Sequence, residues 1–175
     1  DEGDWARRAR PAMDAYGFQG WVWDCPADGG GKTLERISRA ISGTVGQNWS
    51  SSSAPGGTPG GVPIGSSPVP VLYNVRSEPI IPRSNQPITV YAEVQDPVFG
   101  SMEPSQTLFW RRDGQPSFTA TPMALVWQKP GNLGVSRETY AGIIPAQANN
   151  TIIEYYISYT GSVGISATWP APART

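Results

Sequence analysis

The stretch ITVYAEV, residues 88–94, decides the fold class of this chain. Its apolar side chains occupy every second position, which predicts a β-strand with one face on a core and the other toward solvent. The stretch IIEYYISYT, residues 152–160, repeats this alternation, with Ile153, Tyr155 and Ile157 on the expected inner face. Two half-buried strands far apart in the sequence predict an all-β domain.

Similar runs, separated by turn residues, surround these two stretches at intervals of about 8–15 residues, as in β-sandwiches. One run contains Pro122, which marks a bend or a sheet edge, and turns are expected at Asp113-Gly114 and Pro130-Gly131-Asn132. We therefore predict that residues 71–175 form a seven-stranded sandwich of the immunoglobulin-like or fibronectin-III-like class. The expected strands cover residues 71–76, 88–94, 106–112, 117–126, 139–144, 152–160 and 164–169.

Residues 50–70 differ in composition, since 16 of these 21 residues are Ser, Gly or Pro. Such a stretch has too few apolar side chains to fold alone, and we expect a linker. Extended as polyproline II, it would span up to about 65 Å at about 3.1 Å per residue. The chain is thus expected to consist of an N-terminal segment, residues 1–49, this linker, and the sandwich.

The N-terminal segment is rich in tryptophan but lacks sustained periodicity. One short strand is expected around Trp21-Val22-Trp23, whereas the spacing of Leu34, Ile37 and Ile41 fits a short helix as well as a strand. A β-rich segment this short, without a disulfide or metal, is not expected to be stable alone, so its aromatic surface needs a cover. The candidate assembly residues are Trp5, Trp21, Trp23, Leu34, Ile37 and Trp49.

The charge of the chain is close to balanced, with 14 acidic and 13 basic residues. The absence of a basic cluster argues against nucleic acid as a partner. No apolar run approaches the roughly 20 residues that span a bilayer, and no signal-peptide core is present. The chain begins at Asp1 rather than Met, so we expect a processed protein or a piece of a longer one.

Histidine is absent and cysteine occurs once, at Cys25, so the commonest general base, the commonest metal ligand and any intrachain disulfide are missing. We expect Cys25 to be a buried or partly buried thiol, with an intermolecular disulfide as the alternative. Only Lys32 and Lys129 remain as lysine bases for a nucleophile. We therefore predict no catalytic residue, no cofactor and no enzymatic activity. Six carboxylates are expected on a solvated face: Glu78, Glu93, Asp96, Glu103, Glu138 and Glu154.

The run GGGKT, residues 29–33, matches the end of a phosphate-binding loop. The first glycine of that motif would fall at position 26, which is Pro26, so we interpret the run as a turn that enters a strand. Asp24 and Asp28 carry oxygen ligands of the kind that Ca²⁺ prefers, but their spacing fits no standard loop. No metal site is predicted.

Two further patterns concern glycans. Asn48-Trp49-Ser50 and Asn149-Asn150-Thr151 match the N-x-[ST] acceptor pattern, which makes Asn48 and Asn149 candidate glycosylation sites. A carbohydrate-stacking platform of Trp110, Trp127 and Trp169 is an alternative to the expectation that Trp110 lies in the core and the other two at the sandwich edge.

The N-terminal motifs are similar to the closing portion of the lamin-tail domain of large secreted bacterial proteins. The resemblance rests on Gly3-Asp4-Trp5, Gly20-Trp21, the run GGGKTLERI at residues 29–37, and GQNWSSS followed by GGTPGG within residues 46–61. It implies that the run around Leu34-Glu35 is a strand. The opening strands of that domain, with their D-W-x-E-L-x-N signature, are absent from this chain, so a complete lamin-tail fold is not expected.

Residues 71–97 and 140–164 resemble the fibronectin-III-like modules that follow lamin-tail domains in such proteins. The resemblance rests on the proline-rich entry to the strand at residues 88–94, on YAGIIP at 140–145 and on IEYYI at 153–157. It implies an extracellular architectural or adhesive role and carries no catalytic residue.

The expected function is therefore that of a secreted or cell-surface structural or adhesive protein. We expect it to associate with copies of itself, as a subunit of a filament or surface assembly in which the N-terminal segment docks on a neighbouring subunit. The alternative is a carbohydrate-binding or spacer module of a larger secreted enzyme, in which case glycans are the partner.

Overall fold

The computed structural model describes residues 7–9, 12–17, 22–62, 70–97, 103–129 and 136–170. The side chains of residues 7–9, 22–24 and 136 are not described. The chain divides into two compact units, an N-terminal unit of Asp1–Ser67 and a C-terminal unit of Pro68–Thr175. No helix in the described residues is long and apolar enough to cross a membrane.

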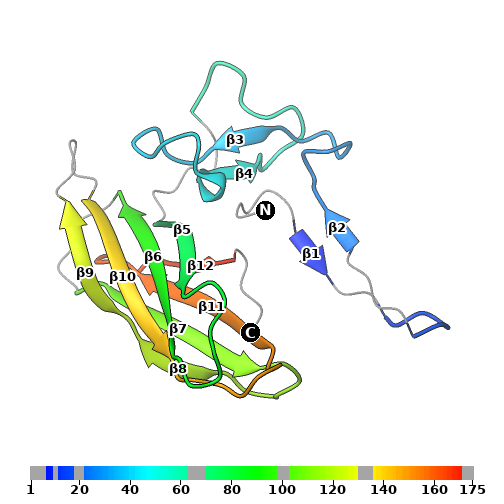
Figure 1. Ribbon diagram of the computed structural model, residues 1–175. Coiled ribbons are helices and arrows are strands. Elements are labelled where there is room, and N and C mark those ends of the chain that lie inside the picture. Colours follow the sequence, from blue (N-terminus) through cyan, green and yellow to red (C-terminus); the bar gives the residue numbers. More distant parts are fainter. Residues whose placement is uncertain are drawn as a thin grey trace. The chain divides into compact units, whose positions relative to one another are not determined.

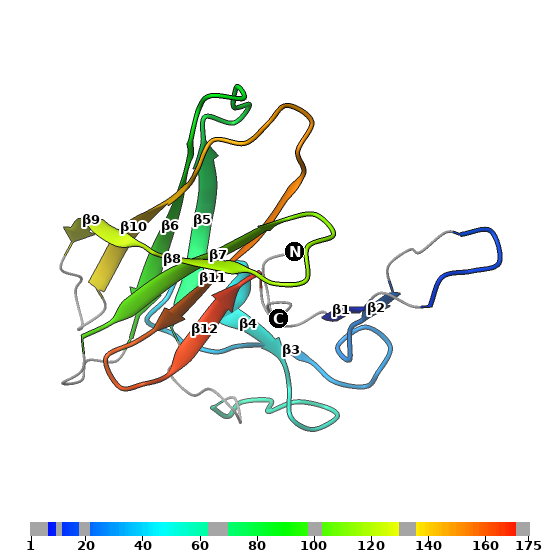
Figure 2. The same cartoon turned by 90° about the horizontal axis from the view of Figure 1, so that it is seen from below.

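The C-terminal unit is a sandwich of two four-stranded antiparallel sheets (Figures 1 and 2). One sheet has the order β5-β6-β10-β9 and the other β12-β11-β7-β8. The first sheet and the first three strands of the second follow the order of an immunoglobulin constant-type sandwich, with β8 as an additional strand. The strands are β5 (Val71–Glu78), β6 (Ile88–Asp96), β7 (Ser105–Arg112), β8 (Thr119–Pro122), β9 (Ala124–Lys129), β10 (Ser136–Ile144), β11 (Ile153–Thr160) and β12 (Ser166–Trp169).

The core lies between the two sheets and is formed by the alternate residues that the sequence predicts to face inward. Val90, Ala92 and Val94 of β6 are fully buried, and so is Ile157 of β11. They pack with Leu108 of β7 in one hydrophobic cluster. The prediction of an all-β sandwich is confirmed, and the residues that decide it lie at its centre.

The sandwich has eight strands in the described residues rather than the expected seven, because the run predicted as one strand at residues 117–126 is divided. β8 ends at Pro122 and pairs with β7, whereas β9 begins at Ala124 and pairs with β10 in the other sheet. Met123, between them, is buried, and its backbone N–H donates to the carbonyl of Gln106 at 2.9 Å. Pro122 therefore marks a corner at which the chain changes sheets.

Two of the six carboxylates expected on a solvated face are buried. Asp96 and Glu138 are only 6% and 7% exposed, at inward-facing positions of β6 and β10. Their side chains accept hydrogen bonds from Tyr159 and Tyr140, respectively. The expectation was wrong for these two because it was based on residue type, since carboxylates are usually exposed. The structure instead follows their position in the strand alternation, which points them inward.

The N-terminal unit contains two two-stranded antiparallel sheets, β1-β2 and β3-β4. Its elements are β1 (Arg7–Ala9), β2 (Val22–Asp24), β3 (Leu34–Arg36), the 3-10 turn η1 (Gly46–Asn48) and β4 (Trp49–Ser51). β2 lies where a short strand was expected, and β3 settles the ambiguity at Leu34 in favour of a strand. Ile41 and Val45, which follow β3, are buried.

The first part of the Ser/Gly/Pro-rich stretch, whose composition predicts a linker, forms hydrogen-bonded structure with β3. Trp49–Ser51 is the strand β4, which pairs with β3. Thr58 donates from its backbone N–H and its hydroxyl to Oε1 of Glu35, at 2.9 and 2.7 Å. Composition missed this because small polar residues can be held by hydrogen bonds without apolar burial.

Candidate functional site

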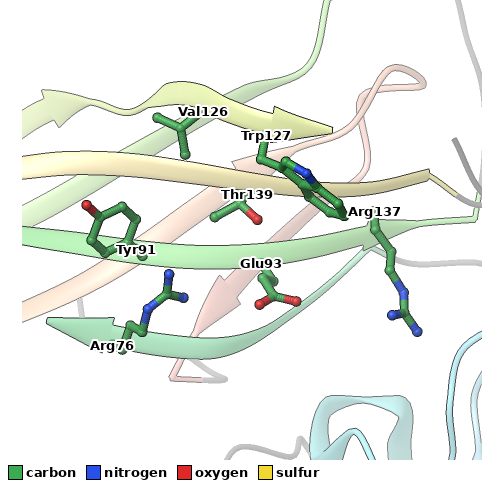
Figure 3. Close-up of a pocket in the computed structure, with 7 residues that line it drawn as sticks. All are labelled: Arg76, Tyr91, Glu93, Val126, Trp127, Arg137 and Thr139. Atoms are coloured by element: carbon green, nitrogen blue, oxygen red, sulfur yellow. The ribbon is translucent and has the colours of Figure 1, made fainter. Parts of the chain in front are cut away.

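The outer face of the β5-β6-β10-β9 sheet carries a shallow groove with a volume of about 380 Å³ (Figure 3). All four strands of the sheet contribute to it. We refer to it as the outer-face groove. Its lining residues are Arg76, Tyr91, Glu93, Val126, Trp127, Arg137 and Thr139.

The strand register explains why this face is hollow. Thr139 of β10 lies opposite Trp127 of β9 on one side and opposite Glu93 of β6 on the other. The Thr139 side chain is small, while Trp127 and the neighbouring Tyr91 are large. Thr139 therefore forms the floor between the larger side chains of Trp127 on one side and Glu93 and Tyr91 on the other. Figure 3 shows these residues along the sheet.

A β-bulge in β9 places two apolar side chains on the same bank. Thr139 pairs with Trp127 and Tyr140 pairs with Leu125, so Val126 has no partner in the ladder. Neighbouring residues of a regular strand point to opposite faces, but the extra residue of a bulge breaks this alternation. Val126 and Trp127 therefore both line the outer-face groove, and both are about half exposed.

The charged side chains of the groove have opposite signs. The guanidinium carbon of Arg76 lies 4.6 Å from the centroid of the Tyr91 ring, a cation–π contact. At the other end, Glu93 and Arg137 both act on the Tyr73 phenol: burial first and the Glu93 carboxylate second raise the pKa of Tyr73 to about 12, and Arg137 opposes them. The groove thus offers a carboxylate acceptor, guanidinium donors and one accessible aromatic side chain.

β9 also forms an edge of its sheet, since it pairs only with β10. All six of its residues are exposed, and Leu125, Val126 and Trp127 retain 48%, 54% and 50% exposure. The strand carries a single charge, on Lys129. An apolar edge of this kind is the usual place for addition of another strand.

Of the predicted assembly residues, the structure describes the surroundings of Leu34, Ile37 and Trp49, which lie in or directly beside the β3-β4 sheet. Trp5 and Trp21 lie outside the described residues, and the Trp23 side chain is not described. Leu34 is 45% exposed on β3, whereas Ile37 and Trp49 are partly buried. The Trp49 indole N–H donates to the carbonyl of Gly43 at 2.8 Å, so this tryptophan closes a loop of its own unit.

The two candidate glycosylation sites differ in access. Asn48 is fully buried, and its amide nitrogen donates to the carbonyls of Ser38, Ile41 and Ser42 at 2.9, 3.0 and 3.2 Å. A glycan on this nitrogen is incompatible with these bonds, so the folded chain does not present Asn48 as an acceptor. Asn149 is exposed in the turn before β11 and stays a candidate.

The other sequence-based candidates have structural roles. The backbone N–H groups of Asp28 and Lys32 donate to the carbonyls of Cys25 and Pro26, which makes GGGKT part of a turn that leads into β3. Cys25 is unpaired and partly buried. Within the described residues, no group of three or more His, Cys, Asp or Glu side chains is placed to hold a metal ion.

The three tryptophans of the C-terminal unit do not share a platform. Trp110 and Trp169 pack against the core from the β12-β11-β7-β8 sheet, and Trp169 stacks on Tyr155 with centroids 6.1 Å apart. Only Trp127 lines the outer-face groove. Sequence reasoning missed the groove because its residues come from four strands whose register is not encoded locally. The signals that the sequence offered were Trp127, expected at the sandwich edge, and the outward positions of Tyr91 and Glu93.

No protein-family model matches the chain, and no curated protein is similar enough to be matched. The candidate function therefore rests on the geometry of the molecule itself.

Proposed function

We propose that this chain is a non-catalytic structural or adhesive protein of the cell exterior that associates with copies of itself. The observation that supports this proposal is the apolar, uncovered edge strand β9. Proteins that stay monomeric normally protect such edges with charges, prolines or covering segments, because an open strand pairs with other chains.

The other edges of the sandwich are better protected than β9. β5 and β12 lie next to each other along one side of the sandwich. β8 is short and ends at Pro122, which lacks the backbone donor that a new strand would need. β9 has six residues and no proline, and Lys129 is its only charged residue that would oppose the addition of another strand.

A second copy of the same strand is the partner that β9 fits best. In an antiparallel pair centred between Val126 and Trp127, each of these residues would lie opposite the other in the partner, and Leu125 would lie opposite Gln128. Lys129 would then face Ala124, so no like charges would meet. Such a twofold contact is closed and extends the two sheets into one.

A filament needs a second, different contact, because a twofold contact alone gives a dimer. The N-terminal unit is the candidate for that contact, since β1-β2 and β3-β4 are two-stranded sheets with unpaired outer edges in the described residues. Extracellular location and an architectural role are part of the same proposal and are supported by the immunoglobulin-like strand order.

The test is sedimentation velocity over a range of concentrations, with the substitution Leu125→Lys. Each chain of the pair would lose the burial of a leucine, which contributes about 1.5–3 kcal/mol, so association should weaken about tenfold or more. The matched control is Ile80→Lys, which changes an equally apolar, exposed residue outside β9. A wild-type chain that is monomeric at high concentration, or association that Leu125→Lys leaves unchanged, would refute self-association through β9.

A further inference from the structure

We infer that the outer-face groove binds a neutral glycan, with one pyranose ring against Trp127 and ring hydroxyls bonded to Glu93 and Arg137. The inference goes beyond self-association, because it concerns a ligand site on the face of the sheet rather than its edge. It rests on the combination of one exposed aromatic side chain with an acceptor and a donor in the same hollow.

The aromatic part of the site is Trp127. Its side chain is half exposed and borders the groove, whereas the Tyr91 ring is already in contact with the Arg76 guanidinium. A pyranose ring has an apolar C–H face and a polar rim, and it matches an indole that is apolar on its face and surrounded by polar groups. Val126, placed on the same bank by the bulge, extends the apolar surface.

The polar part of the site distinguishes a glycan from other ligands. A carboxylate can only accept and a guanidinium can only donate, whereas each sugar hydroxyl does both, so Glu93 and Arg137 suit different hydroxyls of the same glycan. A simple anion would be opposed by Glu93, and the second guanidinium of the groove, that of Arg76, is already paired with Glu78 at 3.3 Å. A purely apolar ligand would leave Glu93 and Arg137 without water or partner. The oppositely charged pair therefore favours an uncharged ligand with many hydroxyls.

The size of the groove agrees with this ligand class. Its volume of about 380 Å³ lies near the lower end of small-molecule sites, which extend over about 300–1,000 Å³. It lies on a sheet, so its banks are positioned by strand register rather than by loops. Thr139 at the floor adds a hydroxyl that can donate or accept.

The experiment is isothermal titration calorimetry of the full chain with four probes: cellohexaose, chitohexaose, mannohexaose and inorganic phosphate. We expect saturable binding of at least one of the three neutral hexasaccharides and none of phosphate. Trp127→Ala should weaken that binding about tenfold or more. Glu93→Ala and Arg137→Ala, which lie off β9, should weaken it as well.

The matched control is Ile143→Ala, which removes an exposed apolar side chain from the same face of β10 outside the groove lining. Leu125→Lys should also bind the hexasaccharide as the wild type does, so failure of the glycan site and failure of self-association are separable. Circular dichroism checks that each variant is folded. Three results would each overturn the inference: no hexasaccharide binds, phosphate alone binds, or binding survives Trp127→Ala, Glu93→Ala and Arg137→Ala.

Discussion

Asp96 and Glu138 point their carboxylates into the sandwich, where each accepts a hydrogen bond from a tyrosine. The Tyr140 hydroxyl lies 2.8 Å from Oε2 of Glu138, and the Tyr159 hydroxyl lies 3.2 Å from Oδ2 of Asp96. Gln128 donates a further bond to Oε1 of Glu138 at 3.1 Å. A buried charge is tolerated only with such donors, so these tyrosines are part of what allows the two acids to lie inside.

The first prediction concerns these tyrosines. Tyr159→Phe and Tyr140→Phe each remove a donor to a buried carboxylate, so each should lower the free energy of unfolding by about 1–3 kcal/mol at neutral pH. Urea denaturation followed by fluorescence measures the loss. Tyr16→Phe, at a tyrosine that is 95% exposed, is the control and should have no effect.

The same pairs predict a pH dependence. Burial first, and then the neighbouring carboxylates, raise the pKa of Tyr140 and Tyr159 well above the ordinary value of 10.0. The folded state therefore holds these protons more tightly than the unfolded state, and the stability they contribute is complete below about pH 10 and is lost as the pH rises toward the folded-state pKa. The urea midpoint should fall between pH 9 and pH 11, by less in the two Phe variants. An equal fall of the urea midpoint in the wild type and in both Phe variants would show that Tyr140 and Tyr159 do not cause the pH dependence.

The positions of Asp96 and Glu138 were partly predictable from the sequence. Asp96 continues the inward series of Val90, Ala92 and Val94, and Glu138 shares the phase of Tyr140. Extending the expected strands 88–94 and 139–144 by one or two residues would have placed both carboxylates inside. The tyrosine partner of Asp96 was not predictable, because Tyr159 lies on the other sheet, 63 positions away in the sequence, and meets Asp96 only after the sheets pack.

At the scale of elements, the change of sheet between β8 and β9 determines where the groove and the open edge lie. Pro122 signalled a break in the predicted strand 117–126, but the composition of the run did not show that its two halves join different sheets. That choice depends on burial of Met123 between the sheets, which is a property of the packed core. The six other predicted strands of this region and the turn at Asp113-Gly114 could be predicted from local sequence signals alone.

The packing beneath this corner gives a further prediction. A Cβ atom at Gly142 of β10 would lie 2.9 Å from Cγ of Met123 and 3.1 Å from Cδ2 of Leu108, both closer than ordinary contact. Gly142→Val should therefore destabilise the sandwich by about 1–3 kcal/mol through overpacking. Thermal unfolding measures the effect, and Met123→Ala in the same chain should restore part of the loss by making room. If Gly142→Val unfolds at the wild-type temperature, the corner is looser than the structure shows.

At the scale of the whole molecule, the chain combines two units that are stabilised in different ways. The C-terminal unit buries a continuous apolar cluster between two sheets. The described part of the N-terminal unit has few buried apolar side chains. It is held together by two polar side chains that each donate to several backbone carbonyls. Asn48 donates to three of them, and Arg36 donates to the carbonyls of Ser38, Arg39 and Ile41. The alternation of apolar residues in the sequence predicted the core of the sandwich. Side-chain hydrogen bonds to the backbone, such as those of Asn48 and Arg36, leave no periodic pattern in the sequence and could not be predicted.

The last prediction follows from this difference. Asn48→Asp keeps the shape of the side chain and its acceptor for the Ser38 N–H, but it removes both amide protons and places a carboxylate beside three carbonyl oxygens. The carbonyls of Ser38, Ile41 and Ser42 each lose one hydrogen bond and keep only the bonds from Arg36 and from the Val45 N–H. Each lost hydrogen bond costs about 0.5–1.5 kcal/mol, and the buried carboxylate adds repulsion from the carbonyl oxygens, which together are a large share of the stability of so small a unit. Hydrogen exchange measured by mass spectrometry should therefore show faster exchange over residues 37–52 and unchanged protection of β6, β7 and β11, because the sandwich has a core of its own. Asn149→Asp, at an exposed asparagine, is the control and should alter neither region. Loss of protection in β6, β7 and β11 of the Asn48→Asp variant would show instead that the two units fold as one cooperative structure.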